Sequence, residues 1–135
     1  VGVLRAASDT RIRVLVSLAG MVHTQAFAAR EFSEETPDQG CMWEEESCPL
    51  SSTYMDDMAT IGTVIEQSPQ VTVPWLLVHG SEDDVVPMQD SHDIVSRAKQ
   101  AQLVQLPGAN HVFSDNGTAP MIEAVVPWVS KQMGA

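Results

Sequence analysis

Two acid–base residues, Asp83 and His111, each follow a short apolar run of the sequence. Asp83 comes just after residues 73–79, and His111 comes just after residues 102–106. Apolar runs of this length, bounded by Gly and Pro, are typical of buried strands. Because neighbouring parallel strands lie about 4.8 Å apart, turns at their ends can bring a carboxylate within hydrogen-bonding distance of an imidazole. The carboxylate would then fix the ring tautomer, while the other ring nitrogen takes a proton from a nucleophile.

The rest of the chain alternates strands with helices, which predicts a parallel α/β sheet. A nearly continuous apolar run rich in β-branched residues indicates a further buried strand over 12–19. Apolar residues at three- and four-residue intervals predict an amphipathic helix over 51–65, with Ser51 or Ser52 as its N-cap. Further helices are expected over 1–7, 89–101 and 118–132. Pro127 should kink or interrupt the last of these helices.

Residues 21–50 are charged, rich in turn residues and without periodicity, apart from one short helix that residues 23–30 could form. In a compact domain, a segment this long with little regular structure is usually a functional lid or a mobile loop. His23 and Trp43 are candidate substrate-binding residues of this segment, because His23 lies just beyond the carboxyl end of a predicted strand. The large apolar side chains could form either a wall of a substrate pocket or the lid's own small core. These side chains are Phe27, Phe32, Met42 and Trp43.

The two strand-end motifs together resemble those of the α/β-hydrolase superfamily, in particular its serine hydrolases and esterases. His79-Gly-Ser-Glu-Asp83-Asp-Val-Val-Pro87 is similar to the family's acid motif, in which the acid lies three residues after the glycine and Val-Pro follows. Gly108-Ala-Asn-His111 is similar to its histidine motif. Their order is that of the last two members of the family's Ser…Asp…His triad. The resemblance implies a three-layer α/β fold with a parallel sheet, catalytic roles for Asp83 and His111, and no cofactor.

The resemblance covers the C-terminal portion of the hydrolase fold. The opening helix resembles the one that follows the nucleophile elbow, and residues 11–20 resemble the next strand. Residues 21–50 then correspond to the cap that these enzymes insert at this point. The chain begins at Val1 without an initiator Met or a signal peptide. We therefore expect residues 1–135 to be a single partial α/β-hydrolase domain, with a cap or lid insertion at about 21–50.

The G-x-S-x-G elbow that the resemblance places before Val1 occurs nowhere in the chain. The closest imitation is Val16-Ser17-Leu-Ala-Gly20, but Ser17 lies within a predicted strand and lacks a small residue two positions upstream. The tight turn would therefore be blocked. The leading hypothesis is a parent serine hydrolase that cleaves a carboxylic ester, or an amide, through an acyl-enzyme. This chain alone should be inactive without a nucleophile. An Asp nucleophile in the absent part, as in dehalogenase relatives, remains open.

The histidines and the aspartates of the two motifs could also have simpler, non-catalytic roles. Asp84 adjoins Asp83 and could cap or solvate the turn, and Asp83 itself could merely accept hydrogen bonds from backbone amides of the turn. His111 could be bonded within a loop. His79 is more often a packing residue than a catalyst in its position at a strand end, and His92 should face solvent on a helix.

Composition argues against several classes of function. The formal net charge is −11, with 18 acidic and 7 basic residues, whereas nucleic-acid binding needs clustered Lys and Arg. No apolar run reaches the roughly 20 residues that span a bilayer. Cys41 and Cys48 could form a local disulfide in an oxidising compartment, but two free thiols in the cytoplasm is the simpler interpretation. No metal site is expected, since no CxxC, HExxH or EF-hand spacing is present.

A second hypothesis has no enzymatic activity. Strand 12–19 would lack its usual neighbour without the N-terminal part of the fold, and unpaired apolar edges promote association. The chain could then be a binding or assembly module that forms a homo-oligomer through this exposed sheet edge.

Overall fold

The computed structural model describes residues 1–134, which divide into two compact units. The first, here called the sheet unit, comprises Val1–Val22 and the chain from Ile65 onward. The second, here called the insert unit, comprises His23–Val64. The insert unit thus contains most of the predicted lid together with the helix that follows it.

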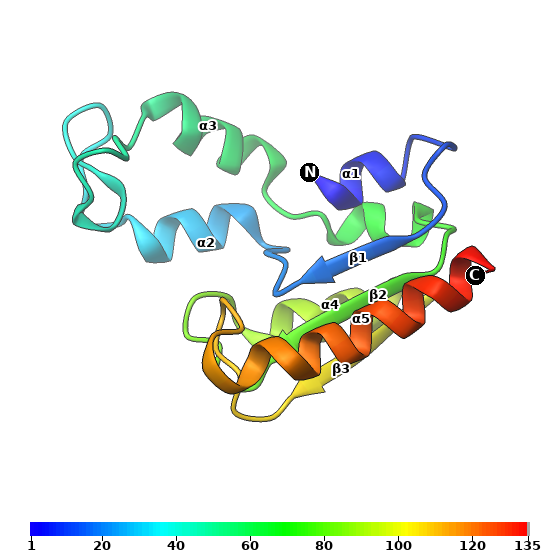
Figure 1. The fold of residues 1–135 in the computed structure, drawn as a ribbon. Coiled ribbons are helices and arrows are strands. Elements are labelled where there is room, and N and C mark those ends of the chain that lie inside the picture. The colour runs from blue at the N-terminus through cyan, green and yellow to red at the C-terminus, as the bar shows by residue number, and fades with distance from the viewer. Residues whose placement is uncertain (135) are drawn as a thin grey trace. The chain divides into compact units, whose positions relative to one another are not determined.

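The sheet unit is built on three parallel strands in the order β1-β2-β3 (Figure 1). The strands are β1 (Leu15–Leu18), β2 (Trp75–Gly80) and β3 (Ala101–Leu106). The register places Trp75 between Leu15 and Ala101, and Gly80 opposite Leu106. The carboxyl ends of all three strands therefore meet at one edge of the sheet. The three predicted strands are confirmed, with β1 shorter than expected. Burial along the whole strand holds for β2 but not for β1 or β3.

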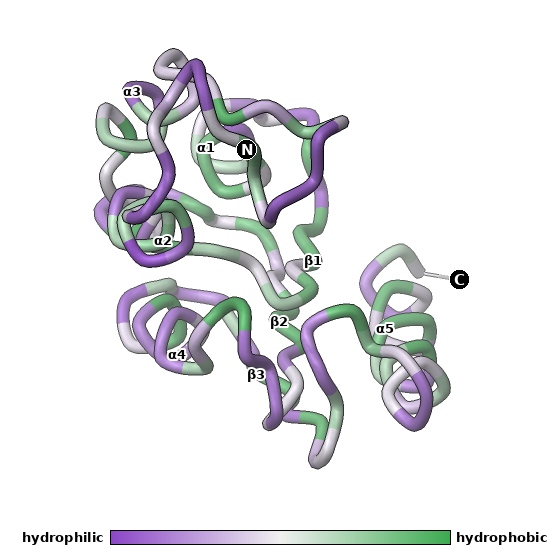
Figure 2. Tube along the Cα trace, turned by 90° about the vertical axis from the view of Figure 1, so that its left-hand side faces the viewer, coloured by the Kyte–Doolittle hydropathy of each residue, from purple (hydrophilic) through white to green (hydrophobic). Residues whose placement is uncertain are grey.

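Helices cover both faces of this sheet. The sheet unit contains α1 (Gly2–Ala6), η2 (Ile65–Gln70), α4 (Met88–Arg97), η3 (Asp115–Gly117) and α5 (Thr118–Met133). Every residue of β2 is buried. Leu76 and Val78 pack with Val125 and Trp128 of α5, whereas His79 bonds to Ser91 of α4. Because successive side chains of a strand point to opposite faces, α4 and α5 form the two outer layers, as the end-on view shows (Figure 2).

The predicted interruption at Pro127 is wrong, since α5 runs from Thr118 to Met133 as one helix. Proline removes one backbone donor and so frees the carbonyl of the residue four positions earlier, here Glu123. Both Pro127 and Glu123 are exposed. Water can therefore satisfy that carbonyl, and the helix continues. No helix among residues 1–134 is long and apolar enough to cross a membrane.

The insert unit pairs α2 (Thr24–Glu31) with α3 (Ser52–Ile61), and η1 (Met42–Glu44) lies in the loop between them. The Thr24 hydroxyl joins the two helices by donating to the Met58 carbonyl at 2.8 Å. Ser51 is the N-cap of α3, as predicted, because its hydroxyl accepts from the Tyr54 amide at 3.1 Å. The loop between the helices is mostly hydrophilic (Figure 2).

Candidate active site

The turn after β2 holds the Asp83 carboxylate in a fixed orientation. Its Oδ1 accepts hydrogen bonds from the Val85 amide at 2.9 Å and from the Val86 amide at 2.8 Å. Asp side chains commonly bond the backbone of their own turn in this way. The Asp83 side chain is 1% exposed, whereas its neighbour Asp84 is exposed. The turn therefore buries one carboxylate and leaves the other in solvent.

The turn after β3 presents His111. Gly108 reverses the chain with φ +72°, a conformation that glycine adopts without strain. Asn110 then stabilises the turn, because its side chain donates to the Ser114 hydroxyl at 2.7 Å and accepts from the Ser114 amide at 3.1 Å. The buried side chain of Phe113 anchors the turn in the core of the sheet unit. The His111 side chain lies between these anchors and is 31% exposed.

Hydrogen bonds join the acid turn directly to the histidine turn. The Ser81 amide donates to the Leu106 carbonyl at 2.9 Å, and the Glu82 amide donates to the Ala109 carbonyl at 3.0 Å. The Ser81 hydroxyl accepts from the Gly108 amide at 2.8 Å. Gly80 makes this approach possible, because a β-carbon at its position would collide with the Ala109 carbonyl oxygen. The two turns therefore form one rigid platform.

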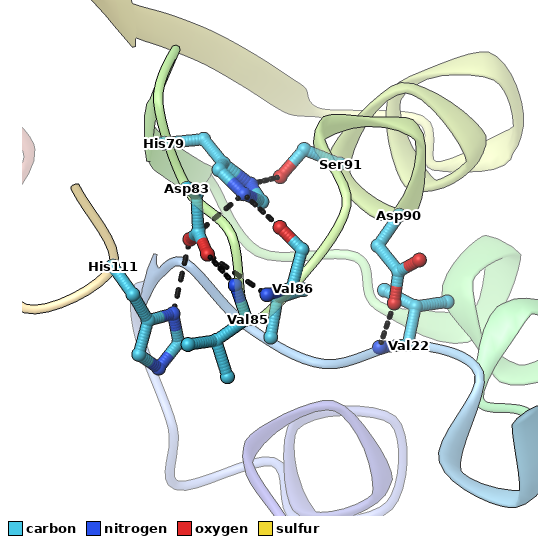
Figure 3. Close-up of polar contacts among 8 residues, drawn as sticks. All are labelled: Val22, His79, Asp83, Val85, Val86, Asp90, Ser91 and His111. Atoms are coloured by element: carbon cyan, nitrogen blue, oxygen red, sulfur yellow. Dashed lines mark hydrogen bonds and ion pairs between the residues drawn. The ribbon is translucent and has the colours of Figure 1, made fainter. Parts of the chain in front are cut away.

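Asp83 and His111 meet on this platform. His111 Nδ1 lies 3.0 Å from Asp83 Oδ2 (Figure 3). Because a carboxylate only accepts, Nδ1 carries the hydrogen, and in the neutral ring Nε2 has a free lone pair. Nε2 bonds to no residue within 1–134. The partly exposed ring therefore presents an unbonded nitrogen at the surface of the sheet unit, a geometry suited to general acid–base catalysis.

A second histidine, which sequence reasoning treated as a packing residue, touches the same carboxylate. His79 is fully buried, and its Nε2 lies 2.9 Å from the Val86 carbonyl oxygen and 3.2 Å from Asp83 Oδ2 (Figure 3). Its Nδ1 lies 2.7 Å from the Ser91 hydroxyl. The only hint in the sequence is its place directly before Gly80, in the acid motif.

Two serines beside β2, Ser17 and Ser91, are each bonded to another side chain. Ser17 lies in β1, and its hydroxyl accepts from the Trp75 indole at 3.0 Å. Ser91, with His79 and Asp83, imitates a Ser-His-Asp array, but its side chain and that of His79 are buried. A substrate could not reach the Ser91 hydroxyl without opening the core. No group of three or more His, Cys, Asp or Glu side chains within residues 1–134 could hold a metal ion.

The other residues singled out from the sequence do not belong to the turns that carry Asp83 and His111. His23 and Trp43 both belong to the insert unit, whereas Asp83 and His111 belong to the sheet unit. Trp43 is 59% exposed, and its ring packs against Phe32 with centroids 5.1 Å apart. Phe27 and Phe32 are buried, so they form the insert unit's own core. His92 is exposed on α4, with Nε2 3.4 Å from Gln105 Nε2. The Cys41 and Cys48 thiols are free.

Comparison with known proteins links this chain to hydrolases. The model of the prolyl oligopeptidase family matches residues 2–135. Esterase LipC of Mycobacterium tuberculosis is 28% identical over 91 residues, which cover 53% of this chain and 23% of LipC.

Solved structures agree with the sequence matches. Est1E from Butyrivibrio proteoclasticus superposes with a TM-score of 0.81 and 26% identity, over 98% of this chain and 56% of Est1E. A second Est1E structure, with ferulic acid bound, gives a TM-score of 0.82. The esterase domain of a Rhodothermus marinus protein shares the fold, with a TM-score of 0.72 at 12% identity. This chain therefore has the α/β-hydrolase fold, and it spans little more than half the length of these solved relatives.

Proposed function

Because the chain belongs to the prolyl oligopeptidase family, we propose that it carries the acid and the base of a serine hydrolase that cleaves carboxylic esters. The supporting observation is the 3.0 Å contact between His111 Nδ1 and Asp83 Oδ2 at the carboxyl edge of a parallel sheet. Ligands of such sheets bind at that edge. The similarity to LipC and Est1E supports an esterase relationship. Cleavage of an amide is the alternative that the family name favours.

In this proposal His111 is the general base and then the general acid. Its Nε2 takes the proton of a serine hydroxyl as that oxygen attacks the ester carbonyl, and later returns a proton to the leaving alcohol. Asp83 holds the ring in the Nδ1–H tautomer and stabilises the imidazolium that forms in between. The two backbone amides on Oδ1 keep the carboxylate oriented throughout.

We place the nucleophile outside these 135 residues. The sequence has no G-x-S-x-G elbow, the Ser17 hydroxyl is occupied by Trp75, and the chain spans 56% of Est1E. The isolated chain should therefore hydrolyse p-nitrophenyl acetate no faster than buffer. Hydrolysis well above buffer that Ser17→Ala abolishes would overturn this placement. The alternative is an Asp nucleophile in place of the serine. Chemical quench of the covalent intermediate would distinguish the two.

A chimera supplies the missing part and tests the roles of Asp83 and His111. The part of Est1E outside the matched 56% would be joined to this chain and assayed with p-nitrophenyl acetate and with a feruloyl ester, since an Est1E structure holds ferulic acid. His111→Ala should lower kcat on the order of 10⁴-fold or more. His92→Ala is the matched control, because His92 is exposed on α4, and it should leave kcat unchanged. An active chimera that is insensitive to His111→Ala would refute the proposal.

We also propose that His23 and Trp43 contact the substrate of the whole enzyme. Trp43 supports this because it is the large aromatic side chain that the insert unit leaves exposed. In the active chimera, Trp43→Ala should raise KM while kcat changes little. A residue that lines the substrate pocket stabilises the bound substrate and the transition state equally. Tyr54→Ala is the control, because Tyr54 also packs against Phe32 but is more buried. Equal effects on KM would mean that Trp43 acts through the fold.

A second candidate function is assembly through the free edge of the sheet. β1 pairs with β2 alone among the strands of residues 1–134, and Leu18 on β1 is 45% exposed. Exposed strand edges are templates for pairing with another chain. A homo-oligomer that joins two β1 edges would follow.

Light scattering after size-exclusion chromatography tests the assembly. The chain should become dimeric as its concentration rises, and Leu18→Lys should keep it monomeric, because a lysine on an edge strand opposes pairing. Thr60→Lys on α3 makes the same +1 change in charge at an exposed position away from β1 in the chain and should leave the dimer intact. A monomer at every concentration would rule out edge pairing.

A further inference from the structure

His79 is a fully buried polar side chain of the sheet unit with a partner on each ring nitrogen. It ends the apolar part of β2 with a fully buried ring. Two hydrogen-bonding contacts occupy its two ring nitrogens, one with the Ser91 hydroxyl and one with the Val86 carbonyl. A buried imidazole with both nitrogens satisfied is fixed in orientation, since turning the ring would leave buried polar atoms unpaired.

The partners of His79 determine its tautomer. The Val86 carbonyl can only accept, so the hydrogen resides on Nε2 and points toward that oxygen at 2.9 Å. Nδ1 of the neutral ring then accepts from the Ser91 hydroxyl at 2.7 Å. The Nε2–H dipole also lies 3.2 Å from Asp83 Oδ2, the same oxygen that His111 bonds.

These contacts give His79 two separate ways to orient the Asp83 carboxylate. The Val86 peptide accepts from His79 at its carbonyl and donates to Asp83 Oδ1 at its amide, so the ring holds the loop that holds the carboxylate. The Nε2–H dipole meanwhile opposes rotation of Oδ2 away from its present place. The orientation of Oδ2 decides whether His111 keeps its hydrogen on Nδ1.

We propose that His79 is a positioning residue of the Asp83–His111 pair: held by Ser91, its buried ring fixes the Val86 loop and the carboxylate so that His111 stays in the Nδ1–H tautomer. The inference rests on the proposed function, because the tautomer matters only if His111 is a base. A positioning role of His79 differs from a packing role, since packing requires only the volume of the ring and not its nitrogens.

The tautomer of His111 can be measured in this chain by ¹⁵N–¹H long-range NMR, without any nucleophile or substrate. In the unchanged chain His111 should be predominantly Nδ1–H. His79→Leu removes both ring nitrogens, and the Nδ1–H to Nε2–H ratio of His111 should fall several-fold. His79→Gln places an amide donor near the position of Nε2 and should restore most of the ratio.

Ile94→Val is the control for a loss of packing, because Ile94 is fully buried on α4 and contacts neither imidazole through a hydrogen bond. It should lower the urea midpoint and leave the His111 ratio unchanged. If His79→Leu behaves like Ile94→Val, His79 only packs and the inference is wrong.

Ser91→Ala provides the test if His79→Leu does not fold. It keeps the imidazole but removes the hydroxyl bonded to Nδ1, which helps to hold the ring in place, so the His111 ratio should fall by less than in His79→Leu but measurably. An unchanged ratio in Ser91→Ala would equally overturn the inference. Failure of the proposed function is distinguishable, because His111 would then lack the Nδ1–H preference in the unchanged chain, or the chimera would be insensitive to His111→Ala.

Discussion

The sheet unit and the insert unit differ in how their polar groups are used. The sheet unit contains a network of buried polar side chains bonded to one another, which comprises Asp83, His79 and Ser91. The insert unit holds half of the chain's 18 acidic residues and one of its 7 basic residues. Most of these charges lie on its surface. One unit specifies a single arrangement of polar atoms, and the other is mainly solvated.

The difference indicates where precise chemistry can be located. A site needs side chains whose rotamers are held by packing and by further hydrogen bonds. The strand ends of the sheet unit meet this requirement, because the two turns pack closely at Gly80 and Ala109 and are joined by hydrogen bonds. The insert unit depends on one ring, Phe32, around which the other aromatic rings pack. Its stability should therefore be sensitive to a change at Phe32.

The largest expected effect is the loss of that ring. Phe32 is 2% exposed, and Phe32→Ala should destabilise the insert unit by about 3–5 kcal/mol, since buried Phe-to-Ala changes lose that much. Hydrogen exchange of the α2 and α3 amides should then accelerate, while the β2 amides keep their protection. Leu76→Ala in the sheet unit core is the converse control, because it should expose the β2 amides. Equal loss of protection in both units after Phe32→Ala would show that they unfold together.

Gly80→Ala should disrupt the platform with a smaller loss of stability. The added methyl would collide with the Ala109 carbonyl, and overpacking costs about 1–3 kcal/mol. The histidine turn must then move away from the acid turn, so the His111 ring should lose its Nδ1–H preference in NMR spectra. Gly108→Ala is the matched control, since φ is +72° there but nothing lies within 4 Å of a β-carbon. It should strain the backbone without separating Asp83 from His111.

The N-cap of α3 should contribute less. Ser51→Ala removes the hydroxyl that accepts from the Tyr54 amide and should cost about 1 kcal/mol, measured from urea unfolding followed by tryptophan fluorescence. Ser52→Ala, one residue later and exposed, should change the unfolding midpoint little. If both changes cost the same, the cap is not what stabilises the start of the helix.

The smallest effect should be a pH dependence at the same helix end. A hydrogen bond from the Ser52 amide lowers the pKa of Asp38 below its ordinary value of 3.8. A lowered pKa stabilises the folded form above the unfolded pKa, and this stabilisation is lost as the pH falls through the folded pKa. The difference in urea midpoint between the chain and Asp38→Ala should therefore be constant near neutral pH and disappear at strongly acidic pH. A difference that grows on acidification would contradict this sign.

Much of the fold could be predicted from the sequence because the relevant signals are local. The apolar runs predict β2 and β3, of which β2 is buried throughout, and Gly80 and Gly108 mark the turns at their ends. The resemblance to hydrolases came from those turns, and the family match and the solved relatives confirm it. Pro127 was misjudged because the cost of a proline depends on whether the freed carbonyl is solvated, and solvation is a property of the folded surface.

By itself the sequence determined the order of the elements and the two strand ends that carry Asp83 and His111, since periodicity and turn residues act over a few positions. Tertiary structure alone decided that Asp83 rather than Asp84 is buried and that His79 contacts the same oxygen as His111. It also brought the Trp75 indole within hydrogen-bonding distance of the Ser17 hydroxyl. These contacts join residues that are up to 58 positions apart. They form only when packed strands and helices exclude water, so their geometry depends on the whole sheet unit at once.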